Sequence, residues 1–405
     1  MIGEIFKAYD IRNTYPDKIN AAAAWRVGYA TGQFIAGQTL DASVRQTNTV
    51  LVSRDMRPHS PELAAALIDG LRAAGRDVVD LGMCDTSFMY FAVNHLAAAG
   101  GVQTTASHNP VNYNGFKLSG QLAKPIGSTT GLNDIKAIAE KLEADDIGPG
   151  SFKPTGKLVS QDLWPAYREH VLSFLTPLKR KGSVVIDACN GMGGRLVPGV
   201  FDGVNNLDIH PLNFQITGSF AHDPNPLVPE NMVPTQEGVR VRRADLGVCF
   251  DGDADRCIIT DETGQIIGCD HLTALLAEHF LERDPGKAVI YDLRSSKVVE
   301  EVIRDRGGEP RMCRVGHVFM KALLREIDGI FGGELSGHFY FRGNYYADSG
   351  AITFAALLSV LGQSDRPLSE LIAPYRKYPQ SGEINFRNDD KDGTLATLKK
   401  KYAKD

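Results

Sequence analysis

The sequence has no apolar run that approaches the roughly 20 residues needed for a membrane-spanning helix. Its first residues, MIGEIFKAYDIRN, also lack the apolar stretch followed by small residues that marks a secretory signal peptide. These two absences predict a cytoplasmic protein with no membrane partner.

The sequence also has only a small excess of one charge sign. The formal net charge is −5, and no cluster of Lys and Arg is interleaved with aromatic residues. A nucleic-acid-binding surface needs a concentrated positive patch, so no nucleic-acid partner is expected. The one basic run, residues 399–401, is typical of a solvated helix face or tail.

Cysteines at metal-site or disulfide spacing are also missing. The six cysteines are scattered in apolar surroundings, and no two form a C-x-x-C motif. This pattern is typical of buried free thiols and argues against disulfides or structural zinc. The six are Cys84, Cys189, Cys249, Cys257, Cys269 and Cys313.

The sequence does contain one pattern three times: an apolar strand, a polar turn and a helix. It occurs at residues 49–75, 183–201 and 288–308. In the first copy, Ser60 is expected to cap a helix, Pro61 to lie in its first turn and Gly75 to end it. A further strand is predicted directly afterwards, in residues 76–82.

A second polar loop follows a strand-like segment in each module. These loops are TTASHNP (104–110), DGDADR (251–256) and GGELSGH (332–338). Ligands bind beyond the carboxyl ends of parallel strands, so the three loops are expected to meet. The predicted fold class is therefore α/β, with three similar α/β modules and mixed sheets around a central cleft.

The predicted domains number four. The first three are residues 1–150, 151–258 and 259–372, with linkers near 145–157 and 284–288. Residues 373–405 are expected to be the incomplete start of a fourth, C-terminal α+β domain. Within it, residues 381–388 are predicted as a strand and a helix is predicted to start near Asp392.

The DGDADR loop places Asp251, Asp253 and Asp255 two residues apart. That spacing directs three carboxylates to one side and makes a hard-oxygen site suited to Mg²⁺. Three alternatives compete with this interpretation. They are an EF-hand completed by Glu262, a haloacid-dehalogenase-like phosphatase with an aspartate nucleophile, and a purely structural Asp-rich turn. Against the EF-hand, Arg256 stands where that motif needs Gly.

Ser107, beside His108, is expected to be exposed at the end of a strand. A serine hydroxyl is a weak nucleophile, whereas a phosphoserine can donate its phosphoryl group directly. Phosphoserine and three aspartates carry more negative charge than one Mg²⁺ neutralises, so basic groups are needed nearby. The candidates are Lys117, Arg256 and Arg12.

The third loop offers polar groups for a sugar. Glu334, Ser336 and His338 alternate along it, a spacing suited to hydrogen bonds with neighbouring hydroxyls. His317, after Gly316, is a candidate general base for a sugar hydroxyl. Each of these motifs alone is more often a solvated turn or a structural residue.

Together the stretches TTASHNP, DGDADR, GGELSGH and YYADSG, in this order, resemble the α-D-phosphohexomutases. FKAYDIRN, NYNGFK, DACNGMGG and GSFAHDPNPLVPEN agree with that family, so the resemblance runs from about residue 3 to about residue 385. AYDIR and NGFK are similar to the forms of the phosphomannomutase/phosphoglucomutase group.

The resemblance implies a reversible conversion of hexose 1-phosphate, mannose or glucose, to hexose 6-phosphate. Ser107 would carry the transferred phosphate and bind Mg²⁺ together with the three aspartates, and a hexose 1,6-bisphosphate would be both intermediate and activator. The implied catalytic residues are Ser107, Lys117, Arg256, His317 and Arg12, and the implied substrate-binding residues are Glu334, Ser336, His338, Arg256 and His108.

Two departures from the family pattern stand out. Asn13 replaces the Gly usual after YDIR. The family's Arg/Ser/Thr-rich loop for the non-transferring phosphate is not expected within these residues. A truncated or non-catalytic sugar-phosphate-binding protein therefore remains an alternative, and so does the aspartate-dependent phosphatase. The choice between mannose and glucose and the oligomeric state stay open.

Overall fold

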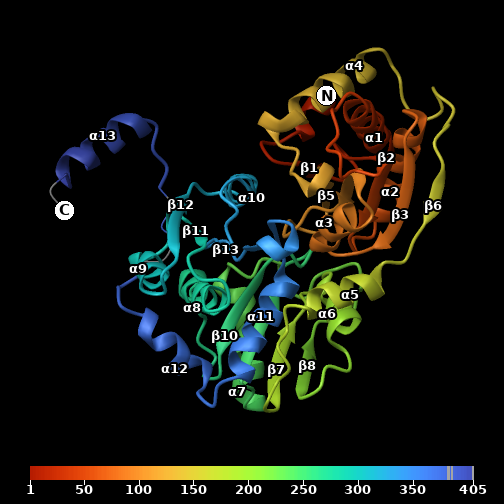
Figure 1. Ribbon diagram of the computed structural model, residues 1–405. Helices are drawn as coiled ribbons and strands as arrows, with labels where there is room; N and C mark the ends of the chain where they lie inside the picture. Colours follow the sequence, from red (N-terminus) through yellow and green to blue (C-terminus); the bar gives the residue numbers. More distant parts are fainter. Residues whose placement is uncertain (381–383, 385, 404–405) are drawn as a thin grey trace.

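Three β-sheets with helices packed against them make up the computed structural model, which describes residues 1–380, 384 and 386–403 (Figure 1). Each sheet contains both parallel and antiparallel strand pairs. The predicted α/β class with mixed sheets is confirmed. Among the described residues, no helix is long and apolar enough to cross a membrane.

The first sheet has the strand order β1-β5-β4-β2-β3-β6. Strands β4, β2, β3 and β6 are parallel to their neighbours in that series, whereas β5 is antiparallel to both β4 and β1. Its strands are β1 (Ile11–Thr14), β2 (Gln46–Arg54), β3 (Asp77–Met83), β4 (Ala98–Thr104), β5 (Tyr113–Gly120) and β6 (Leu158–Ser160). Its helices are α1 (Ala21–Ala36), α2 (Ser60–Ala73), α3 (Thr86–His95) and α4 (Asn133–Ala144).

The second sheet has the order β10-β9-β7-β8, with β7 parallel to β8 and β9, and β10 antiparallel to β9. Its strands are β7 (Gly182–Asp187), β8 (Leu207–Leu212), β9 (Leu246–Phe250) and β10 (Cys257–Asp261). The helices in this stretch are α5 (Trp164–Leu172), α6 (Gly193–Phe201) and α7 (Pro229–Arg242).

The third sheet has the order β12-β11-β13-β14-β15. Strand β11 is parallel to β12 and β13, and the last pairs are antiparallel. Its strands are β11 (Ala288–Asp292), β12 (Glu309–Cys313), β13 (Phe331–Gly333), β14 (Phe339–Phe341) and β15 (Ala347–Asp348). The helices that follow β10 are α8 (Cys269–Leu281), α9 (Lys297–Asp305), α10 (His317–Glu326), α11 (Gly350–Gly362), α12 (Leu368–Ile372) and α13 (Lys391–Lys401).

The three polar loops predicted from the sequence occupy the same place in the three sheets. Each loop leaves a strand that runs parallel to its neighbour and enters an antiparallel strand: β4 to β5, β9 to β10, and β13 to β14. Strand β9 has only buried residues, Leu246–Phe250, so its apolar side chains fix it in the core and its polar continuation emerges at the strand end.

Helix α2 begins one residue earlier than expected. Ser60 lies inside the helix, and its hydroxyl donates to Asp55 Oδ1 at 2.5 Å, so the prediction that Ser60 caps the helix is wrong. The buried Asp55 carboxylate holds Ser60 through this charge-assisted hydrogen bond, and His59 takes the position before the first helical residue. Gly75 has φ +80° directly after the last turn, as a helix-ending glycine does.

The cysteine prediction is also confirmed, since all six thiols are free and buried. The predicted strand at residues 381–388 falls largely on residues outside the described part of the chain. The predicted C-terminal helix is present as α13, which has no buried residue and stands apart from the three sheets (Figure 1).

Candidate functional site

Ser107 lies in the β4–β5 loop with its side chain turned toward the second sheet. Its hydroxyl donates to Asp251 Oδ2 at 3.2 Å and lies 3.3 Å from Nδ1 of His108. The residue has φ +53°, a left-handed conformation that costs energy for a residue with a Cβ. The prediction that Ser107 is exposed is wrong, because only 4% of its surface is accessible.

The close approach of two loop backbones explains this burial. A Cβ on Gly252 would stand 2.5 Å from the carbonyl oxygen of Ser107, so only glycine fits at residue 252. The β4–β5 loop and the β9–β10 loop therefore touch main chain to main chain, and the Ser107 hydroxyl is enclosed between them.

Arg57 holds the β4–β5 loop from behind. Its guanidinium is fully buried and pairs with Asp55 at 3.2 Å. Its remaining N–H groups donate to main-chain carbonyls of the loop, which would otherwise be buried without partners. The accepting carbonyls belong to Ser107, Asn109, Pro110 and Tyr113. Arg57 was not predicted from the sequence, although its place in a polar turn after β2 was a usable signal.

The three aspartates of the β9–β10 loop come together as predicted. One carboxylate oxygen from each of Asp251, Asp253 and Asp255 lies within 4.8 Å of the others, and all three residues are buried. Oδ1 of Asp253 and Oδ1 of Asp255 have no hydrogen-bond partner among the described residues. Buried carboxylate oxygens without partners are costly, so this donor set fits a hard divalent cation.

Lys117 of β5 neutralises part of this charge. Its Nζ donates to Asp253 Oδ2 at 2.7 Å and to Asp255 Oδ2 at 2.6 Å. Burial alone would lower the pKa of Lys117, but the two carboxylates raise it well above its usual range. Burial would likewise raise the pKa of Asp255, yet Lys117 and then His338 hold that pKa well below its usual range.

The pKa of Asp251 is shifted in the opposite direction to that of Asp255. Burial raises the pKa of Asp251 well above its usual range, and the neighbouring charges of Asp255 and Asp253 raise it further. A bound cation would reverse this balance, because it favours the ionised form. Asp253 is held separately by Thr86 at the start of α3, which donates through its hydroxyl to Asp253 Oδ2 and through its N–H to the main-chain oxygen at 3.1 Å.

Arg256 joins the acidic loop to the third sheet. Its main-chain N–H donates to Asp251 Oδ1 at 3.2 Å, and its Nε donates to Nε2 of His338 at 3.3 Å. Nε2 of the same ring lies 3.4 Å from Asp255 Oδ1, and Nδ1 lies 2.9 Å from the Ser336 oxygen. The His338 ring thus links the acidic loop to the third loop beside the Ser336 hydroxyl.

Glu334 lies deeper in the same loop and is only 2% exposed. Its Oε1 accepts from the Gly316 N–H at 2.8 Å and its Oε2 accepts from the Tyr340 hydroxyl. Each carboxylate oxygen keeps a further lone pair for a ligand. The tie to Gly316 also brings the start of α10 close to the third loop.

His317, the first residue of α10, stacks on His338 with ring centroids 6.2 Å apart and meets the edge of Tyr9 at 6.1 Å. Burial lowers the pKa of His317 well below its usual range, and the ammonium of Lys321 lowers it further. The imidazole is therefore neutral near pH 7 and able to accept a proton. Burial, with Arg256 next, likewise lowers the pKa of His108, to about 3.

Arg12 lies on β1 opposite Gly115 of β5, two residues before Lys117. Its Nε pairs with Asp10 at 3.4 Å, and its side chain is 36% exposed. The structure thus places Arg12 at the rim of the cluster, while the other predicted residues form its interior.

A buried ion pair behind the site was missed by the sequence analysis. Lys321 of α10 pairs with Asp348 at 2.5 Å, and its ammonium lies 3.7 Å from the centre of the Tyr90 ring. Asp348 stands within 3.8 Å of His338 Nε2. The stretch YYADSG, which contains Asp348, was a signal, but its spacing alone assigns no partner.

The EF-hand alternative is excluded by the geometry. Strands β9 and β10 flank the loop in place of helices. The Glu262 carboxylate accepts hydrogen bonds from the backbone N–H and the hydroxyl of Ser369, so it is engaged elsewhere.

Comparison with known families gives three matches along the chain. Residues 3–146 match phosphoglucomutase/phosphomannomutase alpha/beta/alpha domain I, residues 165–264 match domain II, and residues 269–378 match domain III. The β4–β5, β9–β10 and β13–β14 loops fall one in each matched segment.

Individual relatives extend the likeness over nearly the whole chain. The phosphohexose mutases of Xanthomonas campestris pv. campestris are 41% identical over 98% of this chain and 86% of their own length. The phosphomannomutase of Vibrio cholerae is 40% identical over 94% of this chain and 82% of its own length. A crystal structure of a phosphoglucomutase/phosphomannomutase family protein from Burkholderia thailandensis superposes with a TM-score of 0.81 at 34% identity, covering 92% of this chain and 79% of that one.

Proposed function

This chain belongs to the phosphoglucomutase/phosphomannomutase family and is a phosphohexomutase, and we propose that it moves the phosphate of a hexose between O1 and O6 through a phosphorylated Ser107. The single observation that carries the proposal is the 3.2 Å hydrogen bond from Ser107 Oγ to Asp251 Oδ2. It joins the serine hydroxyl of one loop to the acidic group of another, across 144 positions of sequence.

The first transfer breaks the Oγ–P bond of phosphorylated Ser107 and forms a P–O bond to the free hydroxyl of a hexose 1-phosphate. The proton of that hydroxyl passes to neutral His317, and the product is a hexose 1,6-bisphosphate. The bisphosphate then turns in the cleft. In the second transfer its O1–P bond breaks, Ser107 is phosphorylated again, a proton returns to O1, and hexose 6-phosphate leaves.

The chain's own residues supply the positioning and charge for these steps. Phosphoryl transfer depends on positioning and on positive charge around the oxygens. Lys117 and Arg256 are partly buried cations that lie 2.6 to 4.0 Å from the carboxylates of the acidic loop. Asp251, Asp253 and Asp255, with the Ser107 phosphate, would hold Mg²⁺, which when bound polarises the phosphoryl oxygens.

The sugar is expected to lie toward the third sheet. A cavity of about 850 Å³ is lined by Leu335 and Ser336 and reaches Gly268 and Lys297. This volume accommodates a hexose phosphate. Ser336 is the member of the predicted sugar-binding set that lines this cavity; Glu334 and His338 would bind sugar hydroxyls beside it, and His108 would contact the sugar beside Ser107.

Phosphorus NMR tests the proposal directly. The protein is incubated with Mg²⁺, mannose 1-phosphate or glucose 1-phosphate, and a trace of glucose 1,6-bisphosphate, and the 6-phosphate signal is followed. We expect a rate proportional to protein, lost in Ser107→Ala and retained in Ser119→Ala, a control at another buried serine of the same sheet.

Two results would contradict the proposal. If Ser107→Ala still forms hexose 6-phosphate, Ser107 is not the phosphoryl carrier. Release of inorganic phosphate that survives Ser107→Ala but is lost in Asp251→Asn would instead identify an aspartate-dependent phosphatase.

A further inference from the structure

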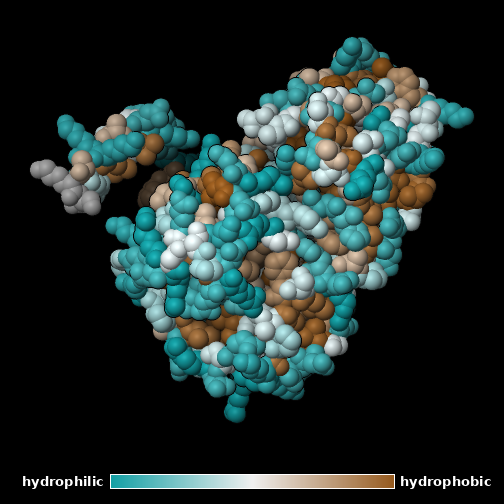
Figure 2. Space-filling view, in the orientation of Figure 1, coloured by the Kyte–Doolittle hydropathy of each residue, from teal (hydrophilic) through white to brown (hydrophobic). Residues whose placement is uncertain are grey.

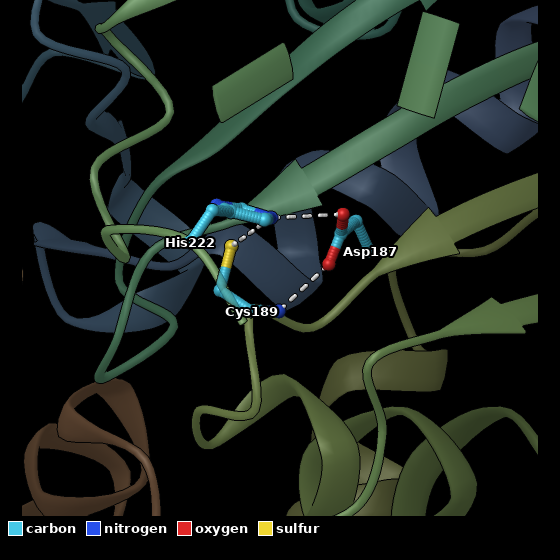
Figure 3. Close-up of side chains that lie close together, drawn as sticks. All are labelled: Asp187, Cys189 and His222. Carbon is cyan, nitrogen blue, oxygen red and sulfur yellow. Dashed lines mark hydrogen bonds and ion pairs between the residues drawn. The ribbon is translucent and has the colours of Figure 1, made fainter. Parts of the chain in front are cut away.

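A second group of metal-ligating side chains lies at the carboxyl end of β7 (Figure 3). Asp187 is the last residue of β7, Cys189 follows in the next turn, and His222 comes from the segment between β8 and α7. One ligand atom from each lies within 4.8 Å of the other two. These three residues are called the Cys–His–Asp cluster below.

The distances in the cluster resemble those of a tetrahedral zinc site. Cys189 Sγ lies 3.8 Å from His222 Nε2, and this nitrogen lies 3.1 Å from Asp187 Oδ2. Bond lengths of about 2.3 Å to sulfur and about 2.1 Å to nitrogen and oxygen place sulfur and nitrogen about 3.6 Å apart, and nitrogen and oxygen about 3.4 Å apart. Each observed separation is within about 0.3 Å of that geometry.

Hydrogen bonds outside the cluster orient its ligand atoms. Nδ1 of His222 lies 3.0 Å from the main-chain oxygen of Asp223, which can only accept, so Nδ1 carries a proton and Nε2 faces the cluster. Oδ1 of Asp187 accepts from the Cys189 N–H at 2.9 Å and from Asn213 Nδ2 at 3.0 Å. This leaves Oδ2 for a ligand, in the manner of metal sites whose ligands are held by outer hydrogen bonds.

The cluster is both enclosed and reachable. Asp187 and Cys189 are fully buried, whereas the His222 side chain is 14% exposed and provides an entry for an ion. The His222 segment is tied to the same turn, because Asn190 Oδ1 accepts from the Ala221 N–H at 2.8 Å. The three ligands are therefore held close together before any ion arrives.

We propose that the Cys–His–Asp cluster binds one borderline-soft divalent cation of the zinc type. Its ligands are Asp187 Oδ2, Cys189 Sγ and His222 Nε2, with water in the fourth position. Thiolate and imidazole select zinc-like ions, while the all-oxygen aspartate set of the β9–β10 loop suits Mg²⁺, so the two sites differ in metal preference. Binding releases the thiol proton of Cys189 to solvent.

The cluster also shows that a search for C-x-x-C spacing does not find every set of potential metal ligands. No C-x-x-C motif is present, but ligands from a strand end, the next turn and a segment 33 residues further on meet in the fold. Spacing in the sequence alone does not reveal such a set.

Metal titration of the whole chain tests the proposal. Protein freed of metal with a chelator is held in excess MgCl₂, and bound zinc per chain is measured during titration with ZnSO₄. We expect one tightly bound zinc per chain in wild type and an affinity at least about tenfold lower in His222→Gln. With Co²⁺ as the probe, wild type should show a thiolate-to-cobalt charge-transfer band that Cys189→Ser loses.

Two controls separate the cluster from the rest of the chain. Cys313→Ser changes a buried cysteine elsewhere, and Asp253→Asn changes the acidic loop; both should retain the band. The alternative is a charged hydrogen bond between His222 and Asp187, which binds no metal. Absence of the band in wild type, or its persistence in Cys189→Ser, would overturn the proposal. The band is measured without any assay of mutase activity. Its absence in wild type is also independent of whether a variant that lacks a ligand folds.

Discussion

The Nη2 atom of Arg57 lies 2.8 Å from the main-chain oxygen of Ser107. One buried side chain from the end of β2 thus fixes the loop that carries the proposed phosphoryl acceptor. The same guanidinium also stacks against the second module, with its centre 5.4 Å from the Phe220 ring. The position of Ser107 therefore depends on a residue with no chemical part in the reaction.

Arg57→Lys is expected to lower both stability and turnover. Lysine keeps the charge but cannot reach four carbonyls, and each buried carbonyl left unpaired costs about 1–3 kcal/mol. The melting temperature should fall by about 5 °C or more, and kcat should fall about 10- to 100-fold because Ser107 is displaced. Circular dichroism and the phosphorus NMR assay measure the two effects. Arg72→Lys, at an arginine whose Nε donates to the Gly156 carbonyl, is the control, and equal losses there would contradict the prediction.

Lys117→Met is expected to bind Mg²⁺ more tightly than wild type while turning over more slowly. In the metal-free protein the ammonium lies 2.7 Å from Asp253 Oδ2 and 2.6 Å from Asp255 Oδ2, so its positive charge opposes an entering cation. Charge-assisted hydrogen bonds of about 1.5–3 kcal/mol correspond to a gain of about 10- to 100-fold in affinity. Isothermal titration calorimetry at pH 8 measures this, with the exposed Lys124→Met as control. Weaker Mg²⁺ binding in Lys117→Met would show that the lysine supports the cation.

Asp85→Asn is expected to change how stability depends on pH. Burial raises the pKa of Asp85 to about 7, although hydrogen bonds from Tyr167 and the Phe88 N–H favour the charged form. The folded state therefore binds a proton that the unfolded state has lost above about pH 4. This stabilisation is complete below pH 4 and is lost as the pH rises through 7.

The melting temperature of wild type minus that of Asp85→Asn should accordingly fall between pH 4 and pH 7 and then level off. Thermal unfolding followed by circular dichroism at several pH values gives this difference. A difference that rises with pH would mean that Asp85 is ionised in the folded protein.

Glu334→Gln is expected to raise KM for the hexose 1-phosphate about tenfold. A carboxylate accepts hydrogen bonds from sugar hydroxyls with both oxygens, whereas an amide keeps one acceptor and loses the charge assistance. Steady-state kinetics checks this. Tyr340→Phe, which removes a donor to Oε2 but leaves the carboxylate intact, is the matched control and should change KM by less than about threefold. A larger effect of Tyr340→Phe would indicate that Glu334 acts through its internal contacts.

Much of the architecture could be predicted because its signals are local. The buried strand Leu246–Phe250 is apolar throughout, and the alternation of Asp251, Asp253 and Asp255 follows it directly. The meeting of the distant loops was predicted from the order of four motifs and from the rule that ligands bind beyond the carboxyl ends of parallel strands.

The remaining features depend on contacts that no local pattern encodes. Ser60 was expected to cap a helix, but the buried Asp55 attracts its hydroxyl. Arg57, Lys321 and Asp348 are single charged residues in a turn, a helix and a short strand, and only the fold buries them beside partners. The burial of Ser107 likewise follows from a neighbour, Gly252, that lies 145 positions away in the sequence.

The contact between Gly252 and the Ser107 carbonyl also restricts how the molecule can move. Two backbones in such close contact cannot slide past one another, so the β4–β5 loop and the β9–β10 loop are expected to move together. The third loop is joined to the β9–β10 loop as well, by a main-chain hydrogen bond from the Cys257 N–H to the Gly337 oxygen at 3.3 Å and by the contact of Arg256 with His338 at 3.3 Å. A turning bisphosphate would therefore meet three loops that are tied together at the aspartates, and the room that it needs would come from side chains rather than from one loop moving alone.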